Sequence, residues 1–208
     1  STDNPLIFPT PENPGSHEVV SQGNFHAEVL ALVADAMSLG LFELSSISER
    51  RIDQMLDPAR RAIRPFLAEN PGLESGLMIV QYVAAASLGE LRGHANPRTA
   101  FSTTTSAGQE DHVSMGATAS WNLLEAIQRC REVLACEAFV AYRAIQLIEK
   151  PSSTCVESLI RCMNNVVLPG IEDRNTSEEI RAIAAEFTSS SWLSVIQSML
   201  KTPLRKSL

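Results

Sequence analysis

The chain has 208 residues, of which 44% are hydrophobic and 20% charged, a composition typical of a globular protein and not of a disordered one. Its net charge of −7, with lysines and arginines scattered rather than clustered, disfavours a nucleic-acid-binding protein, which usually carries a basic surface. Only 5% of the residues are aromatic, so we expect a mostly aliphatic, alanine-rich core of closely packed helices.

The sequence indicates a cytoplasmic setting without membrane insertion. Ser1 to Pro5 has neither the basic region nor the apolar core of a signal peptide. The longest strongly apolar run, Ser75 to Gly89, is shorter than a membrane span requires. Since the chain also lacks an initiator methionine, we expect it to be one piece of a longer polypeptide.

Neither the cysteines nor the histidines predict a metal site. No two of the cysteines have C-x-x-C spacing, and we interpret them as small buried hydrophobes with free thiols in a reducing compartment: Cys130, Cys136, Cys155 and Cys162. The histidines are too dispersed in the sequence to suggest ligands: His17, His26, His94 and His112.

The first part of the chain changes from loop to helix. Residues 1–23 contain four prolines, which predicts loop with short extended pieces. From about Asn24 to Ser45 the pattern is a helix that is apolar nearly all round, as expected of a helix buried in a large core or against partner subunits. The helix continues through Ser46 and is expected to end at Pro58.

The remainder is also predicted to be helical. A helix from Ser75 to about Leu91 is broken by Asn96-Pro97, and Phe101 to Gly108 forms a polar loop. The longest helical pattern runs from about Asp111 to Glu149, and its part from Trp121 onward would make a rod of roughly 43 Å. Pro151 ends it, and two shorter helices follow, at 153–167 and 177–200. The predicted fold is all-α, a long-helix bundle.

The junction from Ser106 to Gly116 contains Glu110, Asp111 and His112, and two interpretations fit these residues. Asp111 can cap the following helix, with Glu110 at the favourable positive end of the helix dipole. Alternatively, the acidic pair and the histidine contribute to chemistry or substrate recognition. The residue types alone favour the cap.

Further motifs change that balance, because together they resemble one family. The resemblance covers about residues 1–150, where the motifs occur in the family's order and at matching spacing. The tail of residues 151–208 resembles the family only weakly, near Glu172-Asp173-Arg174. The sequence is similar to the aromatic amino acid ammonia-lyases in these stretches: Thr2-Asp3-Asn4-Pro5-Leu6, Gln22-Gly23-Asn24-Phe25-His26-Ala27-Glu28, Ser46-Ile47-Ser48-Glu49-Arg50-Arg51, Pro65-Phe66-Leu67, Ser75-Gly76-Leu77-Met78-Ile79 and Gln109-Glu110-Asp111-His112-Val113-Ser114-Met115.

The resemblance implies that the chain is the C-terminal part of a subunit, with residues 1–150 in a central helical bundle. Members of the family are mostly helical homotetramers whose electrophile, 4-methylideneimidazole-5-one (MIO), forms from an internal Ala-Ser-Gly. Neither that tripeptide nor the upstream tyrosines of the family occurs in this sequence. MIO is therefore expected from outside the chain, and the chain alone is expected to be inactive.

Within the family, the residue at Glu110 helps to select the substrate. Gln109-Glu110-Asp111-His112 is similar to the histidine ammonia-lyases, whereas phenylalanine and tyrosine lyases usually have glutamine at Glu110. A carboxylate can accept a charge-assisted hydrogen bond from imidazole or ammonium but finds no partner on a phenyl ring. The resemblance thus implies elimination of ammonia from L-histidine to trans-urocanate, with Glu110 orienting the substrate and exchanging protons with it.

Four other residues are predicted near the substrate. Phe25 matches the aromatic residue beside the electrophile and the substrate ring; its alternative is a core phenylalanine. Gln109 and Met78 match positions near the pocket. Asn4 matches a residue that hydrogen-bonds close to the site, and otherwise is a turn-forming asparagine before Pro5.

Departures from the family leave alternatives open. Gln22 stands where histidine lyases usually have glycine, and the loop from Phe101 to Gly108 lacks their common aspartate and proline. A phenylalanine or tyrosine ammonia-lyase or aminomutase is the nearest alternative. A non-catalytic helical oligomerisation module is the alternative of another class.

Overall fold

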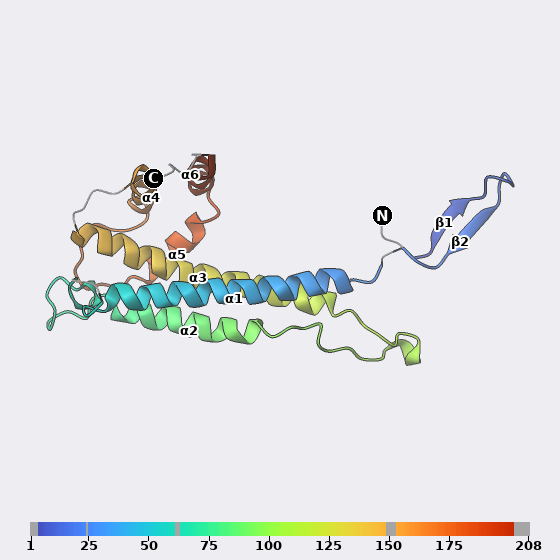
Figure 1. Cartoon of the computed structure of the whole chain (residues 1–208), viewed down its shortest axis with the longest axis horizontal. Helices are drawn as coiled ribbons and strands as arrows, with labels where there is room; N and C mark the ends of the chain where they lie inside the picture. The colour runs from blue at the N-terminus through green and yellow to red at the C-terminus, as the bar shows by residue number, and fades with distance from the viewer. Residues whose placement is uncertain (1–3, 24, 61–62, 149–152, 202–208) are drawn as a thin grey trace, which may run out of the picture.

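The computed structural model describes residues 4–23, 25–60, 63–148 and 153–201. Its body is a bundle of three long helices, α1 (Glu28–Leu56), α2 (Met78–His94) and α3 (Gly116–Ile148) (Figure 1). Helix α2 runs opposite to α1 and α3. Three shorter helices lie to one side of α3: α4 (Thr154–Met163), α5 (Ser177–Glu186) and α6 (Ser190–Lys201). The predicted long-helix bundle is confirmed.

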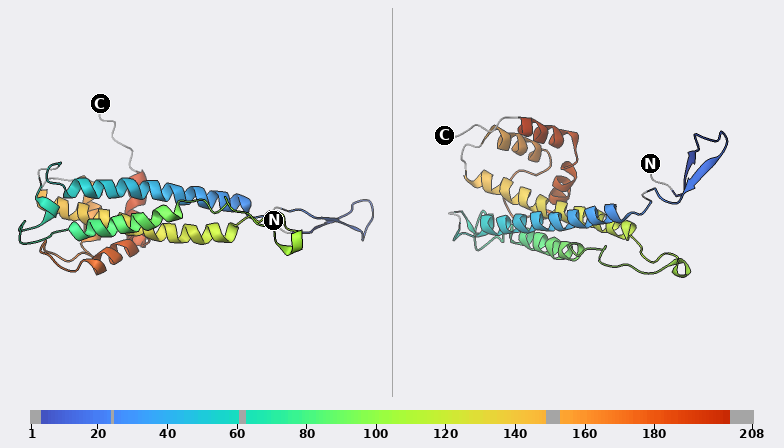
Figure 2. Two further views of the ribbon diagram at one scale, coloured as in Figure 1. Left: turned by 90° about the horizontal axis from the view of Figure 1, so that it is seen from below. Right: turned by 45° about the vertical axis from the view of Figure 1, so that its right-hand side comes forward.

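A small β-hairpin precedes the bundle. Strands β1 (Leu6–Pro9) and β2 (His17–Val20) pair antiparallel, with Leu6 opposite Val20. The short extended pieces expected in this proline-rich region therefore pair with each other. The hairpin projects beyond the start of α1, at the same end of the bundle as the long loop between α2 and α3 (Figures 1 and 2).

Several helix ends lie close to the positions predicted from the sequence. Helix α1 is continuous through Ser46 and ends at Leu56, just before Pro58. The predicted start at Asn24 and the predicted ends at Glu149 and Pro151 lie outside the described residues.

The single helix predicted over residues 177–200 is wrong. Helix α5 ends at Glu186, and α6 begins at Ser190. The Ser189 hydroxyl accepts a hydrogen bond from the Trp192 amide (3.2 Å), so it caps the first turn of α6 and separates the two helices.

Most of the large apolar side chains of the core gather at one end of the bundle. The end of α1, the start of α2 and the end of α3 meet there with α5, and α6 contributes Trp192. Burying each such side chain contributes roughly 1.5–3 kcal/mol. The most deeply buried members are Ile52, Leu56, Val80, Val133, Phe139, Val140 and Ile183.

The other end of the bundle is packed differently. Helices α1 and α3 meet there through small residues, Ala31, Ala34 and Ala119. Large side chains of α1 instead point outward and are 50–70% exposed; we call this set the apolar surface of α1: Val29, Leu30, Leu32, Val33, Met37 and Leu39. The sequence left burial in a large core or against partner subunits open, and within this chain these side chains are not covered.

Helix α1 is also long and apolar enough, by length and composition, to cross a bilayer. That criterion is met equally by core helices of globular proteins, and α1 packs against both α2 and α3. Its length and composition therefore do not distinguish a membrane span from a helix covered by protein.

Candidate active site

The loop between α2 and α3 is anchored to α1 by a buried carboxylate. Asp35 Oδ2 accepts hydrogen bonds from the Thr99 amide (2.9 Å) and hydroxyl (2.7 Å). Burial opposes ionisation of Asp35, but hydrogen bonds from the backbone of Arg98 and Thr99 outweigh it and lower the pKa of the carboxyl below its usual value. The ionised side chain thus fixes the first residues of the loop.

Further hydrogen bonds give the loop the form of an irregular hairpin. The Val113 amide donates to the Ser102 hydroxyl (2.9 Å), and Thr105 and Glu110 exchange backbone hydrogen bonds (2.9 and 3.3 Å). A single 3₁₀ turn, η2 (Ser106–Gly108), closes the tip with left-handed backbone. Gln109 and Glu110 follow this turn, and both side chains are exposed.

The start of α1 meets this loop through three side chains. The rings of His26 and His112 are stacked with centroids 5.4 Å apart. His26 Nε2 lies 3.2 Å from the His112 carbonyl oxygen, and His112 Nε2 lies 3.6 Å from Glu28 Oε2. Phe25 directly precedes His26 and is 56% exposed. The structure therefore brings Phe25, Gln109 and Glu110 to the same end of the bundle.

Asn4 lies at the base of the β-hairpin that leads into this region. Its Oδ1 accepts a hydrogen bond from the Ser21 hydroxyl (3.1 Å), which ties the two ends of the hairpin together. Its predicted role near the substrate stays a prediction.

Met78 does not join the other four predicted residues within one chain. It is the first residue of α2, whereas the last residue, His94, contacts Asn122 near the start of α3 (2.9 Å). The 17 residues of α2 place Met78 roughly 24 Å away along the helix axis, at the opposite end of the bundle.

Two structural alternatives from the sequence are wrong. Asp111 does not cap the long helix, because α3 begins only at Gly116, after four residues without regular secondary structure. Phe25 is not a core residue, because more than half of its side chain is exposed. Glu110 and Phe25 are thus both displayed at the surface of this chain.

The sequence singled out His112 in the junction before the long helix, but not its contacts with His26 and Glu28. The histidines are separated by 86 residues, and their pairing depends on α1 and α3 starting side by side. The available signal was only their adjacency to Phe25 and to Glu110-Asp111. Within the described residues, no group of three or more His, Cys, Asp or Glu side chains is arranged to hold a metal ion.

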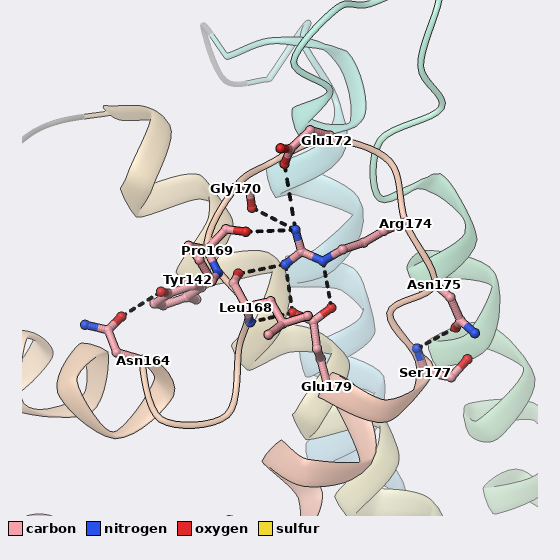
Figure 3. Close-up of polar contacts among 10 residues, drawn as sticks. All are labelled: Tyr142, Asn164, Leu168, Pro169, Gly170, Glu172, Arg174, Asn175, Ser177 and Glu179. Atoms are coloured by element: carbon pink, nitrogen blue, oxygen red, sulfur yellow. Dashed lines mark hydrogen bonds and ion pairs between the residues drawn. The ribbon is translucent and has the colours of Figure 1, made fainter.

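A hollow lies between α2, α3 and α5 and reaches the end of the bundle where α2 begins. It has a volume of about 870 Å³ and is bordered by the segment 173–177. There Asp173 accepts hydrogen bonds from the amides of Ser75 (2.7 Å) and Gly76 (2.8 Å), just before α2. Next to it, Arg174 pairs with Glu179 (Figure 3). These contacts fasten the C-terminal segment to the start of α2.

Comparison with known proteins identifies the family. The family model described as aromatic amino acid lyase matches residues 1–166. The chain belongs to the aromatic amino acid lyase family. The resemblance predicted from the separate motifs is therefore confirmed, and the family match extends beyond residue 150 into the tail.

Relatives within the family are named histidine ammonia-lyases. The chain is 38% identical over 204 residues to the histidine ammonia-lyase of Geobacillus sp. (strain WCH70) and 39% identical over 197 residues to that of Deinococcus radiodurans. These alignments cover 97% and 95% of the chain but only 39% and 37% of the relatives. The chain thus spans less than two fifths of their length.

Solved structures of the family have the same fold over this part. Histidine ammonia-lyase from Trypanosoma cruzi superposes with a TM-score of 0.86 at 34% identity, covering 94% of this chain and 38% of that one. A phenylalanine aminomutase from Pantoea agglomerans gives a TM-score of 0.80 at 26% identity, covering 86% and 37%.

The family uses MIO as its electrophile. The present sequence contains no Ala-Ser-Gly. Glu110 and Phe25 are both exposed at the same end of the bundle, and their roles toward a substrate stay predictions.

Proposed function

We propose that the chain is part of a cytoplasmic histidine ammonia-lyase subunit that converts L-histidine to trans-urocanate and ammonia in histidine catabolism. The observation that carries the proposal is that the loop bearing Glu110 contacts, through His112, the residues His26 and Glu28 that follow Phe25 in sequence. One carboxylate and one phenyl ring are thereby presented at the same end of the bundle. The names of the relatives support the same substrate.

Glu110 selects for a substrate that carries hydrogen-bond donors. Its carboxylate can accept a charge-assisted hydrogen bond from the imidazole or ammonium of histidine, worth about 1.5–3 kcal/mol. Facing a phenyl ring instead, a desolvated Glu110 would lose water without gaining a partner. Phe25 contributes ring-to-ring packing, and Gln109 and Asn4 contribute polar groups around the substrate.

The remaining requirements come from outside the chain. MIO, formed from an Ala-Ser-Gly elsewhere in the subunit, supplies the electrophile when present. Residues of this chain bind the amino acid, orient its ring and, at Glu110, accept or return a proton.

A homotetramer accounts for two further features. The apolar surface of α1 is exposed in the chain and requires a partner to cover it. Met78 lies at the end of the bundle remote from Glu110, so it can border a pocket with Glu110 only if the two residues come from different copies.

The decisive experiment compares substrates in the complete subunit that contains this chain. We expect kcat/KM to be highest for L-histidine rather than L-phenylalanine or L-tyrosine, and Glu110→Gln to lower the value for histidine at least about tenfold. Asp111→Asn removes one carboxylate at the next position and is the matched control. A preference for phenylalanine, undiminished by Glu110→Gln, would reject the histidine assignment in favour of a phenylalanine or tyrosine enzyme.

The non-catalytic alternative is tested by the gene. If the reading frame continues into a segment with Ala-Ser-Gly, or a companion chain supplies one, the lyase assignment stands. If neither exists, the chain is a helical oligomerisation module and cannot perform the reaction as it stands.

A further inference from the structure

Three side chains connect the two segments that carry the predicted site residues. His26 and Glu28 lie at the start of α1, and His112 lies in the loop before α3. We call these three residues the histidine latch. Because a carbonyl oxygen can only accept, His26 carries its proton on Nε2 and donates it to the His112 carbonyl. The charged form of His112 pairs with the Glu28 carboxylate at 3.6 Å.

The backbones that the latch connects, at the starts of α1 and α3, are already close together. A Cβ atom added to Gly116 would lie 2.6 Å from the Cβ of Ala27, so the starts of α1 and α3 approach more closely than any residue larger than glycine permits. The stacked imidazoles, with planes inclined by 20°, lie next to this contact in sequence. The Gly116–Ala27 contact and the latch thus both fix the position of the start of α1 relative to the start of α3.

The latch residues lie close to both Phe25 and Glu110 along the chain. Phe25 is bonded to His26, and only Asp111 separates Glu110 from His112. Among the described residues 104–112, no other side chain forms a hydrogen bond, ion pair or ring contact with the start of α1. These three residues therefore contribute, together with the Gly116–Ala27 contact, to the position of Glu110 relative to Phe25.

We propose that His26, Glu28 and His112 are positioning residues that hold Glu110 in register with Phe25. This inference rests on the proposed function, in which Glu110 orients the substrate. The three residues act through Glu110 and are not catalytic themselves. Since His112 is 54% and Glu28 29% exposed, their contacts order the loop locally and add little to the stability of the bundle.

The contact itself is tested on this chain by hydrogen–deuterium exchange. We expect His112→Leu to accelerate exchange of amides in residues 104–113 at least about tenfold, with the core helices unchanged. His17→Leu, the same substitution at an exposed histidine of the β-hairpin, is the matched control and leaves this segment unaffected. Unchanged exchange of residues 104–113 in the His112→Leu variant would overturn the proposal.

The positioning role is tested in the complete subunit. We expect His112→Leu to raise KM for L-histidine about tenfold with a smaller change in kcat, and His112→Gln, which restores a donor toward Glu28, to return KM to within about threefold. In a Glu110→Gln background, His112→Leu should have little further effect, because the latch acts through the carboxylate. Fully multiplicative losses would show that His112 acts independently of Glu110 and would overturn the inference.

The two proposals fail differently. If Glu110→Gln leaves turnover of histidine unchanged, the proposed function of Glu110 is wrong, whatever the latch does. If Glu110→Gln lowers turnover but His112→Leu does not, the proposed function stands and the positioning role is wrong.

Discussion

Arg174 and Glu179 form a two-point ion pair, in which Nη2 lies 2.8 Å from Oε1 and Nε lies 3.1 Å from Oε2 (Figure 3). Arg174 also donates to the carbonyl oxygens of Leu168 (2.7 Å) and Gly170 (3.1 Å), and Glu179 accepts from the Leu168 amide (2.9 Å). Two side chains thus bind the segment that joins α4 to α5.

This pair predicts a contribution to acid stability. Burial opposes ionisation of Glu179, but the hydrogen bonds from Arg174 and the Leu168 amide outweigh it and lower the pKa of the carboxyl below its ordinary value of 4.5. Because the folded-state pKa is lowered, the stabilisation is complete above about pH 4.5 and is lost as the pH falls through the folded-state value.

We therefore expect Glu179→Gln to cost about 2 kcal/mol at pH 7 and to flatten the loss of stability between about pH 5 and 2. Thermal unfolding followed by circular dichroism across this range provides the measurement. Glu178→Gln, at the exposed neighbouring position in α5, should retain the wild-type pH dependence. Parallel curves for wild type and Glu179→Gln would contradict the prediction.

The sequence was sufficient for the fold where local patterns decide it. The apolar periodicity along α3 and the proline at Pro58 predict a long helix and a helix end without reference to the rest of the molecule. The break at Ser189 was missed because three consecutive serines offer equivalent capping hydroxyls inside a pattern that remains amphipathic.

The candidate site was harder to predict from the sequence, because it depends on contacts between residues far apart in the chain. The order of the motifs that contain Phe25 and Glu110 was sufficient to predict the family. The histidines that join the two segments are 86 residues apart, and no local pattern predicts their contact. Likewise, the composition of α1 indicates an apolar helix without specifying what covers it, and the structure shows that this chain covers only part. Neither the close approach of two helix starts nor an uncovered apolar surface can be predicted from the periodicity of the sequence.

The cysteines predict a two-step labelling experiment. Burial raises the pKa of the Cys136 thiol to about 12, with a smaller contribution from Glu132, and burial also raises the pKa of Cys130. Cys155 and Cys162 are only partly buried. Because the thiolate is the reacting species, a chromogenic disulfide reagent at pH 8 should titrate Cys155 and Cys162 in the native chain and all four thiols in denaturant.

The identity of the labelled thiols is checked by peptide mapping. A Cys155→Ser/Cys162→Ser variant should show almost no reaction in the native state and two thiols after unfolding. Rapid native labelling of Cys136 would mean that the core around Phe139 opens far more readily than its burial implies.

The apolar surface of α1 predicts that substitutions there disturb assembly and not folding. Val33 and Met37 are 53% and 50% exposed and lie one helical turn apart on α1. In the complete subunit, Val33→Glu/Met37→Glu should weaken association at least about 100-fold, because two charges would be buried without partners at an interface.

Sedimentation velocity of the complete subunit measures this effect, and far-UV circular dichroism verifies that the helices remain. Leu73→Glu, at a 92% exposed apolar residue in the turn before α2, controls for the loss of hydrophobic surface. We expect the wild type and the control to sediment as one oligomer and the double variant to sediment as smaller species. A wild-type complete subunit that sediments as a stable monomer would contradict both this prediction and the proposed homotetramer, since the apolar surface would then be covered within a single subunit.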